Sequence, residues 1–323
     1  MPEPRSPAGE GARLDLPFTG IPTFLRAPLV ADLAGLEADA AVLGVPFDEG
    51  SPFMPGSRFG PRALREHSLR FVGPEPGYFD PQRGRRYLAG ARLADAGDAD
   101  VLPTNVEGTF ANVTQAVSAI RAGDARVVAL GGDHAITYPV VRGLGGPLHV
   151  LHFDAHLDYM PFVHGLQYTN QHAFRQLRRL PQVQSLTQVG IRSLRNTERM
   201  LRDSLADGNR VVTMEEFGEL SAEDIAAWIP AGADCYVSID IDVLDLSLVP
   251  GCVSAEPEGM TYRQLRDTLR LVAARTRVVG FDLVEVNPQL DVGTGVTAYL
   301  GAHTVVEFLG AILERAEGEP PGP

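Results

Sequence analysis

Short apolar segments rich in Val, Ile and Leu recur along the chain, and helical patterns separate many of them. The clearest helical patterns cover residues 112–123, 221–229 and 260–275. Near-continuous apolar strands that alternate with helices are typical of a parallel sheet covered on both faces. We therefore predict an α/β fold with a central, mostly parallel sheet. Its predicted strands are residues 40–45, 126–132, 148–153, 186–191, 210–214, 234–241 and 277–286.

The two ends of the chain differ in composition from the region between them. Residues 1–12 and 316–323 are rich in Pro and Gly and contain few apolar residues, so we expect mobile tails there. No repeat and no internal linker interrupts residues 13–315. We predict that this region forms one domain, although its length alone would allow two.

Three titratable side chains stand directly behind one predicted strand. The segment LHFDAHLDY sets Asp154, His156 and Asp158 at a spacing of two residues. Residues at that spacing point to the same side of an extended chain, so their polar groups would converge. In a helix, His156 would instead face away from both aspartates. Taken alone, the same pattern also fits a polar turn after a strand.

Other predicted strands also end in polar residues. His134 follows a strand in GGDH, Asp240 and Asp242 repeat the two-residue spacing in SIDIDVLD, and Glu285 lies in VEVNP. In open α/β sheets, ligands bind beyond the carboxyl ends of the strands. We therefore expect these side chains to meet at one edge of the sheet.

Such a group of side chains predicts a metal centre. Crowded carboxylates raise one another's pKa, so several would carry protons unless cations were present. Six ligands are too many for one tetrahedral zinc ion but suit a pair of ions that share carboxylates. Mixed imidazole and carboxylate ligands without a thiolate favour Mn²⁺, although metal supply also decides which ion binds. The candidate ligands are His134, Asp154, His156, Asp158, Asp240 and Asp242.

In order and spacing, the chain resembles the ureohydrolase family of arginases and agmatinases, and it is most like the agmatinases. The motifs that carry the resemblance are PGSRFGPRALREHS, GGDHAITYP, HFDAHLDY, SIDIDVLD and GFDLVEVNP, which together span roughly residues 40–310. The resemblance implies a three-layer α/β/α fold, two Mn²⁺ ions per chain, and hydrolysis of a guanidinium group to urea and an amine. It also implies a homo-oligomer, a trimer or a hexamer.

The resemblance also assigns roles by position. One ion would be bound by His134, Asp154, Asp158 and Asp240, and the other by Asp154, His156, Asp240 and Asp242. The residues expected to act in catalysis are Asp158, His164 and Glu285. His164 matches the family's proton-shuttle histidine, Glu285 matches its guanidinium-binding glutamate, and Asp158 would accept a hydrogen bond from the attacking hydroxide. The chain departs from many relatives at PGCVSAEPEG (250–259), beside the predicted metals.

The substrate is predicted from the loop between Asp158 and His164 rather than from the metal ligands. Only YMPFV separates Asp158 from His164, where arginase-like relatives carry a longer polar insert. This short, mostly apolar segment suits a methylene chain, so we predict agmatine, which would be cleaved to urea and putrescine. Guanidinobutyrate, other ω-guanidino compounds and arginine remain alternatives. The residues that recognise the substrate's tail, expected among 167–172, cannot be identified from the sequence.

The sequence argues against three rival functions. Binuclear metallophosphoesterases also need GDxxD and GNH[DE] motifs, and zinc deacetylases of related fold need a His-His pair. The sequence contains none of these three motifs. A protein that only bound metal would have no use for His164 and Glu285. His149 and His152, which lie in the strand before the motif, are interpreted as core residues or supports rather than ligands.

The amino-acid composition excludes further classes of protein. The sequence contains no lysine, which excludes pyridoxal-phosphate enzymes, Schiff-base aldolases and the lysine-dependent phosphate loop. A net charge of −13 argues against a nucleic-acid partner and favours a small cationic guanidino substrate. No apolar run reaches the roughly 18 residues of a membrane helix, and no signal peptide is evident, so we expect a cytoplasmic protein without a membrane partner. Cys235 and Cys252 are expected to be free thiols.

Overall fold

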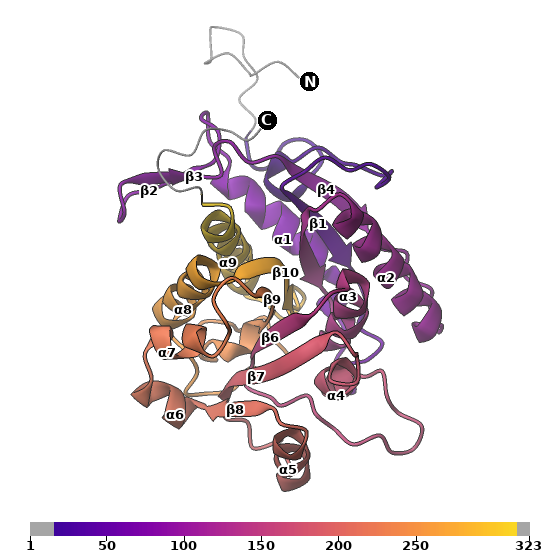
Figure 1. Cartoon of the computed structure of the whole chain (residues 1–323). Helices are drawn as coiled ribbons and strands as arrows, with labels where there is room; N and C mark the ends of the chain where they lie inside the picture. The colour runs from indigo at the N-terminus through magenta and orange to yellow at the C-terminus, as the bar shows by residue number, and fades with distance from the viewer. Residues whose placement is uncertain (1–15, 315–323) are drawn as a thin grey trace, which may run out of the picture.

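The computed structural model describes residues 16–314, so both predicted tails, 1–12 and 316–323, lie largely or wholly outside the described residues. Within the described residues, eight parallel strands form one sheet in the order β4-β1-β5-β10-β9-β6-β7-β8 (Figure 1). A separate antiparallel hairpin joins β2 (Tyr78–Asp80) to β3 (Arg85–Tyr87). The strands of the main sheet are β1 (Ala40–Val45), β4 (Leu93–Asp98), β5 (Arg126–Gly131), β6 (Leu148–Phe153), β7 (Val183–Ile191), β8 (Arg210–Thr213), β9 (Asp234–Asp240) and β10 (Arg277–Val284).

Helices cover both faces of the sheet, which gives the predicted three-layer α/β/α arrangement (Figure 1). Alternate side chains of β5 enter different cores: Val128 and Leu130 pack on one face, and Val127 and Ala129 pack on the other. The first face is covered by α1 (Gly60–Ser68), α7 (Ala222–Ala227), α8 (Tyr262–Arg275) and α9 (Val296–Ile312). The second is covered by α2 (Val106–Ala122), α3 (Thr137–Leu144) and α4 (Ala173–Leu177), and α5 (Glu198–Ala206) and α6 (Met214–Glu219) flank β8.

All seven predicted strands are present, with small shifts of their ends. Several elements were not predicted, and β4 and α9 show why. Strand β4 has the sequence LADAGD, which lacks the branched apolar residues that mark the other strands. Helix α9 is apolar on most of its circumference, because it packs against both α1 and α8, and so it shows little helical periodicity. The helical pattern at 221–229 corresponds to α7, which begins with a capping box: the Ser221 hydroxyl and the Asp224 carboxylate cap the helix reciprocally.

The order of the strands in the sheet determines where the site lies. Strands β5, β10, β9 and β6, which carry the four motifs, are consecutive neighbours in the middle of the sheet. Because all of them are parallel, their carboxyl ends lie at the same edge. Gly132, directly after β5, allows a close approach there, since a Cβ atom on it would lie 1.8 Å from the backbone oxygen of Phe47.

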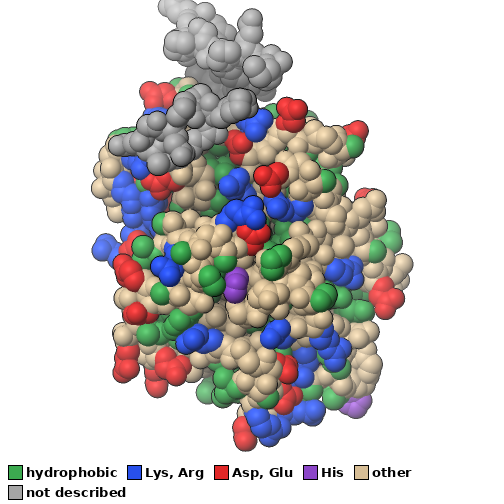
Figure 2. Space-filling model, viewed as in Figure 1, with side chains coloured by type: hydrophobic (Ala, Val, Ile, Leu, Met, Phe, Trp, Pro, Cys, Tyr) green, Lys and Arg blue, Asp and Glu red, His purple; other side chains and the backbone are tan. Residues whose placement is uncertain are grey.

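On the face seen in Figure 2, arginine and acidic side chains lie interspersed over the surface. Exposed ion pairs such as Arg62–Glu66, with 3.3 Å between nitrogen and oxygen, contribute little to stability. Within residues 16–314, no helix has the length and apolar character needed to cross a membrane.

Candidate metal centre

The predicted ligands meet at the carboxyl edge of the sheet. Asp154, His156 and Asp158 follow β6, while Asp240 ends β9 and Asp242 lies in the short turn after it. His134 begins the turn after β5. The four aspartates and His134 expose at most 7% of their surface. Buried carboxylates at this density require either protons or counter-charges.

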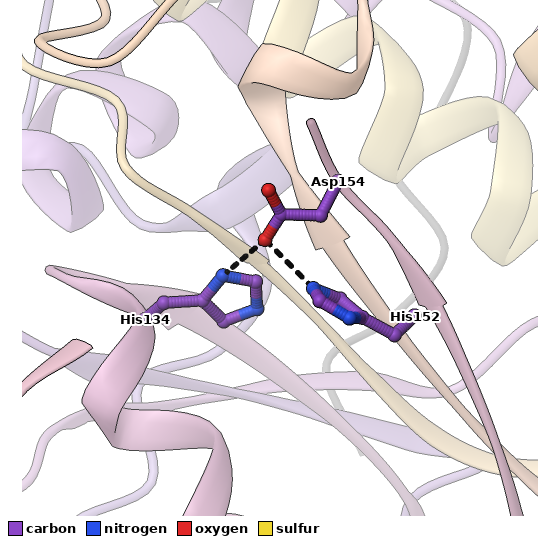
Figure 3. A group of neighbouring side chains, drawn as sticks. All are labelled: His134, His152 and Asp154. Carbon is purple, nitrogen blue, oxygen red and sulfur yellow. Dashed lines mark hydrogen bonds and ion pairs between the residues drawn. The ribbon is translucent and has the colours of Figure 1, made fainter. Parts of the chain in front are cut away.

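His134 is the centre of a first group. Its Nδ1 lies 3.0 Å from Asp154 Oδ2, 3.1 Å from Asp240 Oδ2 and 3.3 Å from Asp158 Oδ2. Figure 3 shows the ring of His134 facing the Asp154 carboxylate, with His152 on the other side of the same oxygen. Three carboxylate oxygens from two strand ends therefore surround one ring nitrogen.

A hydrogen-bond chain behind the ring fixes which nitrogen of His134 carries its proton. Nε2 lies 2.9 Å from the hydroxyl of Ser238. That hydroxyl donates to Asp282 Oδ1 at 2.7 Å, so it accepts the hydrogen of Nε2. In the neutral ring, Nδ1 is then unprotonated and directs its lone pair at the carboxylates, the state required of a metal ligand.

His156 is the centre of a second group, which shares Asp154 with the first. Its Nδ1 lies 3.2 Å from Asp154 Oδ1 and 3.0 Å from Asp242 Oδ2. Apart from this contact with the His156 ring, Asp242 Oδ2 has no hydrogen-bond donor within the described residues, although it is fully buried. Asp154 thus faces His134 with one oxygen and His156 with the other.

His152 supports this arrangement rather than competing with it. Its Nδ1 accepts a hydrogen bond from the Gln188 amide at 3.1 Å, and that amide nitrogen also donates to the backbone oxygen of Leu157. The hydrogen of His152 is therefore on Nε2, which donates to Asp154 Oδ2 at 2.7 Å. The ring stacks on Phe174 at 3.5 Å between centroids. His152, Asp154 and His134 lie close enough to hold a metal ion, but the proton on Nε2 makes His152 a positioning residue for Asp154.

The charge of the centre is unbalanced. Burial, followed by the neighbouring carboxylate of Asp154, raises the pKa of both Asp158 and Asp242. Burial lowers the pKa of His134, but its hydrogen bonds to Asp154 and Asp240 outweigh that effect and raise the pKa well above its ordinary value. Each shift draws a proton into the site, which is what a cluster of acids does when it lacks cations. The donor set therefore fits divalent ions.

Two acids of the site stand on left-handed backbone. Asp158 has a φ of 45° and Glu285 has a φ of 64°, a conformation that side-chain-bearing residues rarely adopt. Glu285 is held there by its amide, which donates to the backbone oxygen of Gly132 at 2.9 Å. Its Oε1 accepts hydrogen bonds from the His134 amide at 3.0 Å and from Asn170 Nδ2 at 3.3 Å. Backbone strain of this kind concentrates at functional sites.

A small cavity of about 100 Å³ opens onto the two groups. Its lining includes His156, Asp158, Asp240 and Glu285. The remaining lining residues are apolar, neutral polar or, in one case, cationic: Met160, Asn170, Gln171, Arg195, Asn196, Met200 and Ser254.

Comparisons with known proteins agree with this geometry. The model of the arginase family matches residues 38–310 of the chain. The proclavaminate amidinohydrolase of Streptomyces clavuligerus is 34% identical over 90% of this chain and 93% of that protein. Its solved structure superposes with a TM-score of 0.79 at 32% identity, over 92% of this chain and 98% of the other. The chain belongs to the arginase family.

Two further members of the arginase family illustrate its range. The guanidinopropionase of Pseudomonas aeruginosa is 34% identical over 93% of this chain and 94% of its own. The mitochondrial agmatinase of Gallus gallus is 32% identical over 90% of this chain and 85% of its own. The ureohydrolase resemblance drawn from the motifs is thus confirmed at the level of the family, and a preference for agmatine is not.

Within this arginase-family chain, one predicted catalytic residue stands apart. His164 lies on an exposed turn between Val163 and Leu166, with a φ of 54°, and is not among the residues that line the cavity. The structure brings Asp158 and Glu285 together with the predicted ligands, but not His164.

Sequence reasoning missed several residues around the centre. Ser238 and Asp282 lie in register on β9 and β10, and only that pairing reveals their link to His134. Asn170 falls in the segment expected to recognise the tail, but its contact with Glu285 could not be inferred. Arg195 is contributed by the loop after β7 and carries no motif.

Proposed function

We propose that this chain hydrolyses the guanidinium group of a small guanidino substrate, releasing urea, at a centre that holds two Mn²⁺ ions. One observation carries this proposal: the six predicted ligand residues converge in two groups, one around His134 and one around His156, which share Asp154. The first ion would be held by His134, Asp154, Asp158 and Asp240, and the second by Asp154, His156, Asp240 and Asp242, so that both sets include Asp154 and Asp240.

The distances within the donor set suit such ions. Ligand atoms at about 2.1 Å from a small divalent ion, at right angles to one another, are separated by about 3 Å. The separations around His134 Nδ1 are 3.0 to 3.3 Å, and those around His156 Nδ1 are 3.0 and 3.2 Å. Carboxylate oxygens with imidazole nitrogens are ligands that Mn²⁺ accepts.

The side chains of the cavity would position the reaction. When bound, the ions supply a water acidic enough to act as hydroxide near neutral pH. Glu285 would pair with the guanidinium through Oε2, because the described residues donate hydrogen bonds to Oε1 only. Asp158 would accept a hydrogen bond from the attacking hydroxide. Addition to the guanidinium carbon and cleavage of its bond to the tail nitrogen then release urea and an amine.

The leaving amine needs a proton as this bond breaks. We assign that role to His164, because imidazole is the side chain that most often serves as a general acid or base in enzymes. Because its loop lies outside the cavity in this structure, His164 would act only when the loop approaches the bound substrate.

The tail of the substrate separates two candidates. The short apolar segment after Asp158 favours agmatine, as inferred from the sequence. Arg195 favours a carboxylate instead, because it is a cation in the cavity lining, and the acids of that lining are Glu285 and two proposed metal ligands, Asp158 and Asp240. The names of relatives such as guanidinopropionase point in the same direction. We therefore propose an ω-guanidino acid as the preferred substrate, with agmatine as the second candidate.

Urea release from a panel of guanidino compounds tests the proposal. The panel contains guanidinopropionate, guanidinobutyrate, agmatine and arginine, each with added Mn²⁺. We expect activity to disappear after exhaustive chelation and to return with Mn²⁺, and one of the two acids to give the highest kcat/KM. Agmatine as the best substrate would refute the role of Arg195, and arginine would refute the argument from the short loop. Full activity after chelation would refute the metal centre.

A further inference from the structure

Cys252 places a thiol beside the metal centre. The side chain is 7% exposed and lies in the segment between β9 and α8. Its sulfur and carboxylate oxygens of Asp240 and Asp242 all lie within 4.8 Å of one another. No role in the proposed hydrolysis requires this thiol, because neither imidazole group includes it.

The backbone next to Cys252 is fixed on both sides. The Gly251 amide donates to Thr297 Oγ1 at 2.7 Å, and the Gly251 carbonyl accepts from the Asn287 amide at 2.7 Å. A side chain at Gly251 would meet Asp291 at 2.7 Å and Thr297 at 3.0 Å, so the chain packs tightly there. The position of the thiol is therefore set by backbone contacts, and its approach to the two carboxylates is built into the fold.

A second observation points to a ligand at the same place. Asp242 is fully buried, and its Oδ2 accepts no hydrogen bond within the described residues. The Asp242 carboxylate, whose Oδ2 has only the His156 ring as a polar neighbour among the described residues, and the Cys252 thiol together offer two of the atom types that a divalent ion binds. Thiolate is a soft ligand that favours thiophilic ions, whereas carboxylates and imidazoles alone also serve harder ones.

We infer that Cys252, with Asp240 and Asp242, ligates a thiophilic divalent ion of the Zn²⁺, Co²⁺ or Cd²⁺ class. The inference rests on the proposed metal centre, because it shares two carboxylates with it. As the metal–sulfur bond forms, the thiol proton passes to solvent, and no oxidation or reduction takes place. The centre then has two modes: Mn²⁺ bound through oxygen and nitrogen, and a softer ion bound through sulfur as well, which competes with Mn²⁺.

Cobalt provides a direct readout. Metal-free protein is titrated with Co²⁺, and thiolate-to-cobalt charge-transfer absorption is followed in the near ultraviolet. We expect this absorption in the wild type and in Cys235→Ala, which removes the other cysteine, and its loss in Cys252→Ser. X-ray absorption at the cobalt edge should show a sulfur ligand at about 2.3 Å, the length of metal–thiolate bonds to zinc.

Competition between ions completes the test. Cys252→Ser should weaken Cd²⁺ binding by about tenfold or more and change Mn²⁺ binding by less than about threefold, because only the soft ion uses sulfur. Cobalt that binds the wild type without sulfur absorption would overturn the inference, as would absorption that persists in Cys252→Ser. Both readouts from the wild type remain decisive if the variant does not fold. Failure of the wild type to bind Mn²⁺ would instead refute the proposed centre.

Discussion

Two buried clusters of charged residues differ in whether the fold itself supplies a partner for the buried carboxylates. In the first, the guanidinium of Arg65 forms two bonds to Asp95, with Nε at 2.8 Å from Oδ2 and the second nitrogen at 2.9 Å from Oδ1. Asp98 and the carbonyl of Gly97 accept two further hydrogen bonds from the guanidinium, at 2.6 and 2.7 Å. Asp95 Oδ2 also accepts the amide of Phe24. The buried carboxylate of Asp95 thus has its own cation and accepts hydrogen bonds at both oxygens, while Asp98 is half exposed to solvent.

The second cluster, at the carboxyl edge of the sheet, has no such match. Four aspartates and Glu285 face two imidazoles, and atoms of Asp242 and His156 lack hydrogen-bond partners within the described residues. Burial and neighbouring acids raise the pKa of Asp240. A buried cluster that supplies its own counter-charge needs nothing from solution and holds the fold together. A buried cluster that lacks its own counter-charge is a binding place for a cation. Removing one charged side chain from each of the two clusters tests this contrast.

The largest effect is expected in the unbalanced cluster. Asp240→Asn removes a charge that would bridge both ions, so we expect both to be lost. Urea release should fall by about 10³-fold or more, because two metal ions contribute several kcal/mol and each ~1.4 kcal/mol is tenfold. Metal content measured by mass spectrometry and urea release check this. His149→Asn is the control, since His149 bonds to Ser185 away from the centre. Two ions retained in Asp240→Asn would contradict the bridging role.

A substitution in the cluster around Arg65 should lower the stability of the protein and leave its metal content unchanged. Arg65→Met leaves Asp95 buried without its partner, so we expect the free energy of unfolding to fall by about 3–5 kcal/mol. Denaturant titration measures the change. Arg62→Met, one turn earlier on α1, removes only an exposed pair with Glu66 and should change stability by less than about 1 kcal/mol. A loss of metal from Arg65→Met would show that the two clusters are not independent.

The two clusters also differ in how far the sequence reveals them. Asp154, His156 and Asp158 could be predicted to converge because a two-residue spacing at a strand end fixes their direction. Arg65 and Asp95 are 30 positions apart, on a helix and on a strand that the pattern did not predict. Their pairing depends on the packing of α1 against the sheet, which no local pattern encodes.

The same limit applies around the metal centre. The order of motifs and the alternation of strands and helices were sufficient to predict the layers and the edge that carries the site. The support of His134 by Ser238 depends on how β9 pairs with β10, and the placement of Cys252 depends on contacts with Asn287 and Thr297. Strand register and long loops are set by tertiary packing, so these residues could only be found in the structure.

A smaller effect is expected from the support of His134. Ser238→Ala removes the acceptor of the Nε2 hydrogen, so the ring loses the bond that keeps Nδ1 directed at the carboxylates. Contacts of this kind change metal affinity by about 10- to 100-fold. Mn²⁺ titration of the metal-free protein measures the change. Ser185→Ala, which breaks the 2.8 Å bond between Ser185 and His149 outside the centre, is the matched control and should leave the affinity unchanged. Equal affinity in Ser238→Ala would mean that the fold alone orients His134.

The smallest effect is expected at the rim of the cavity, where charge is balanced but exposed to water. Arg195 pairs with Glu256 at 3.0 Å and keeps 55% of its side chain exposed. Because solvent screens its charge, a carboxylate bound there gains only about 1 kcal/mol, which corresponds to roughly a fivefold change in affinity. Arg195→Met should therefore raise the KM for guanidinobutyrate about fivefold, leave kcat nearly unchanged, and leave the KM for agmatine unchanged or lower. Arg199→Met, equally exposed on α5 and outside the cavity lining, is the control. An equal rise in KM for both substrates would mean that Arg195 shapes the cavity wall without recognising the charge of the tail.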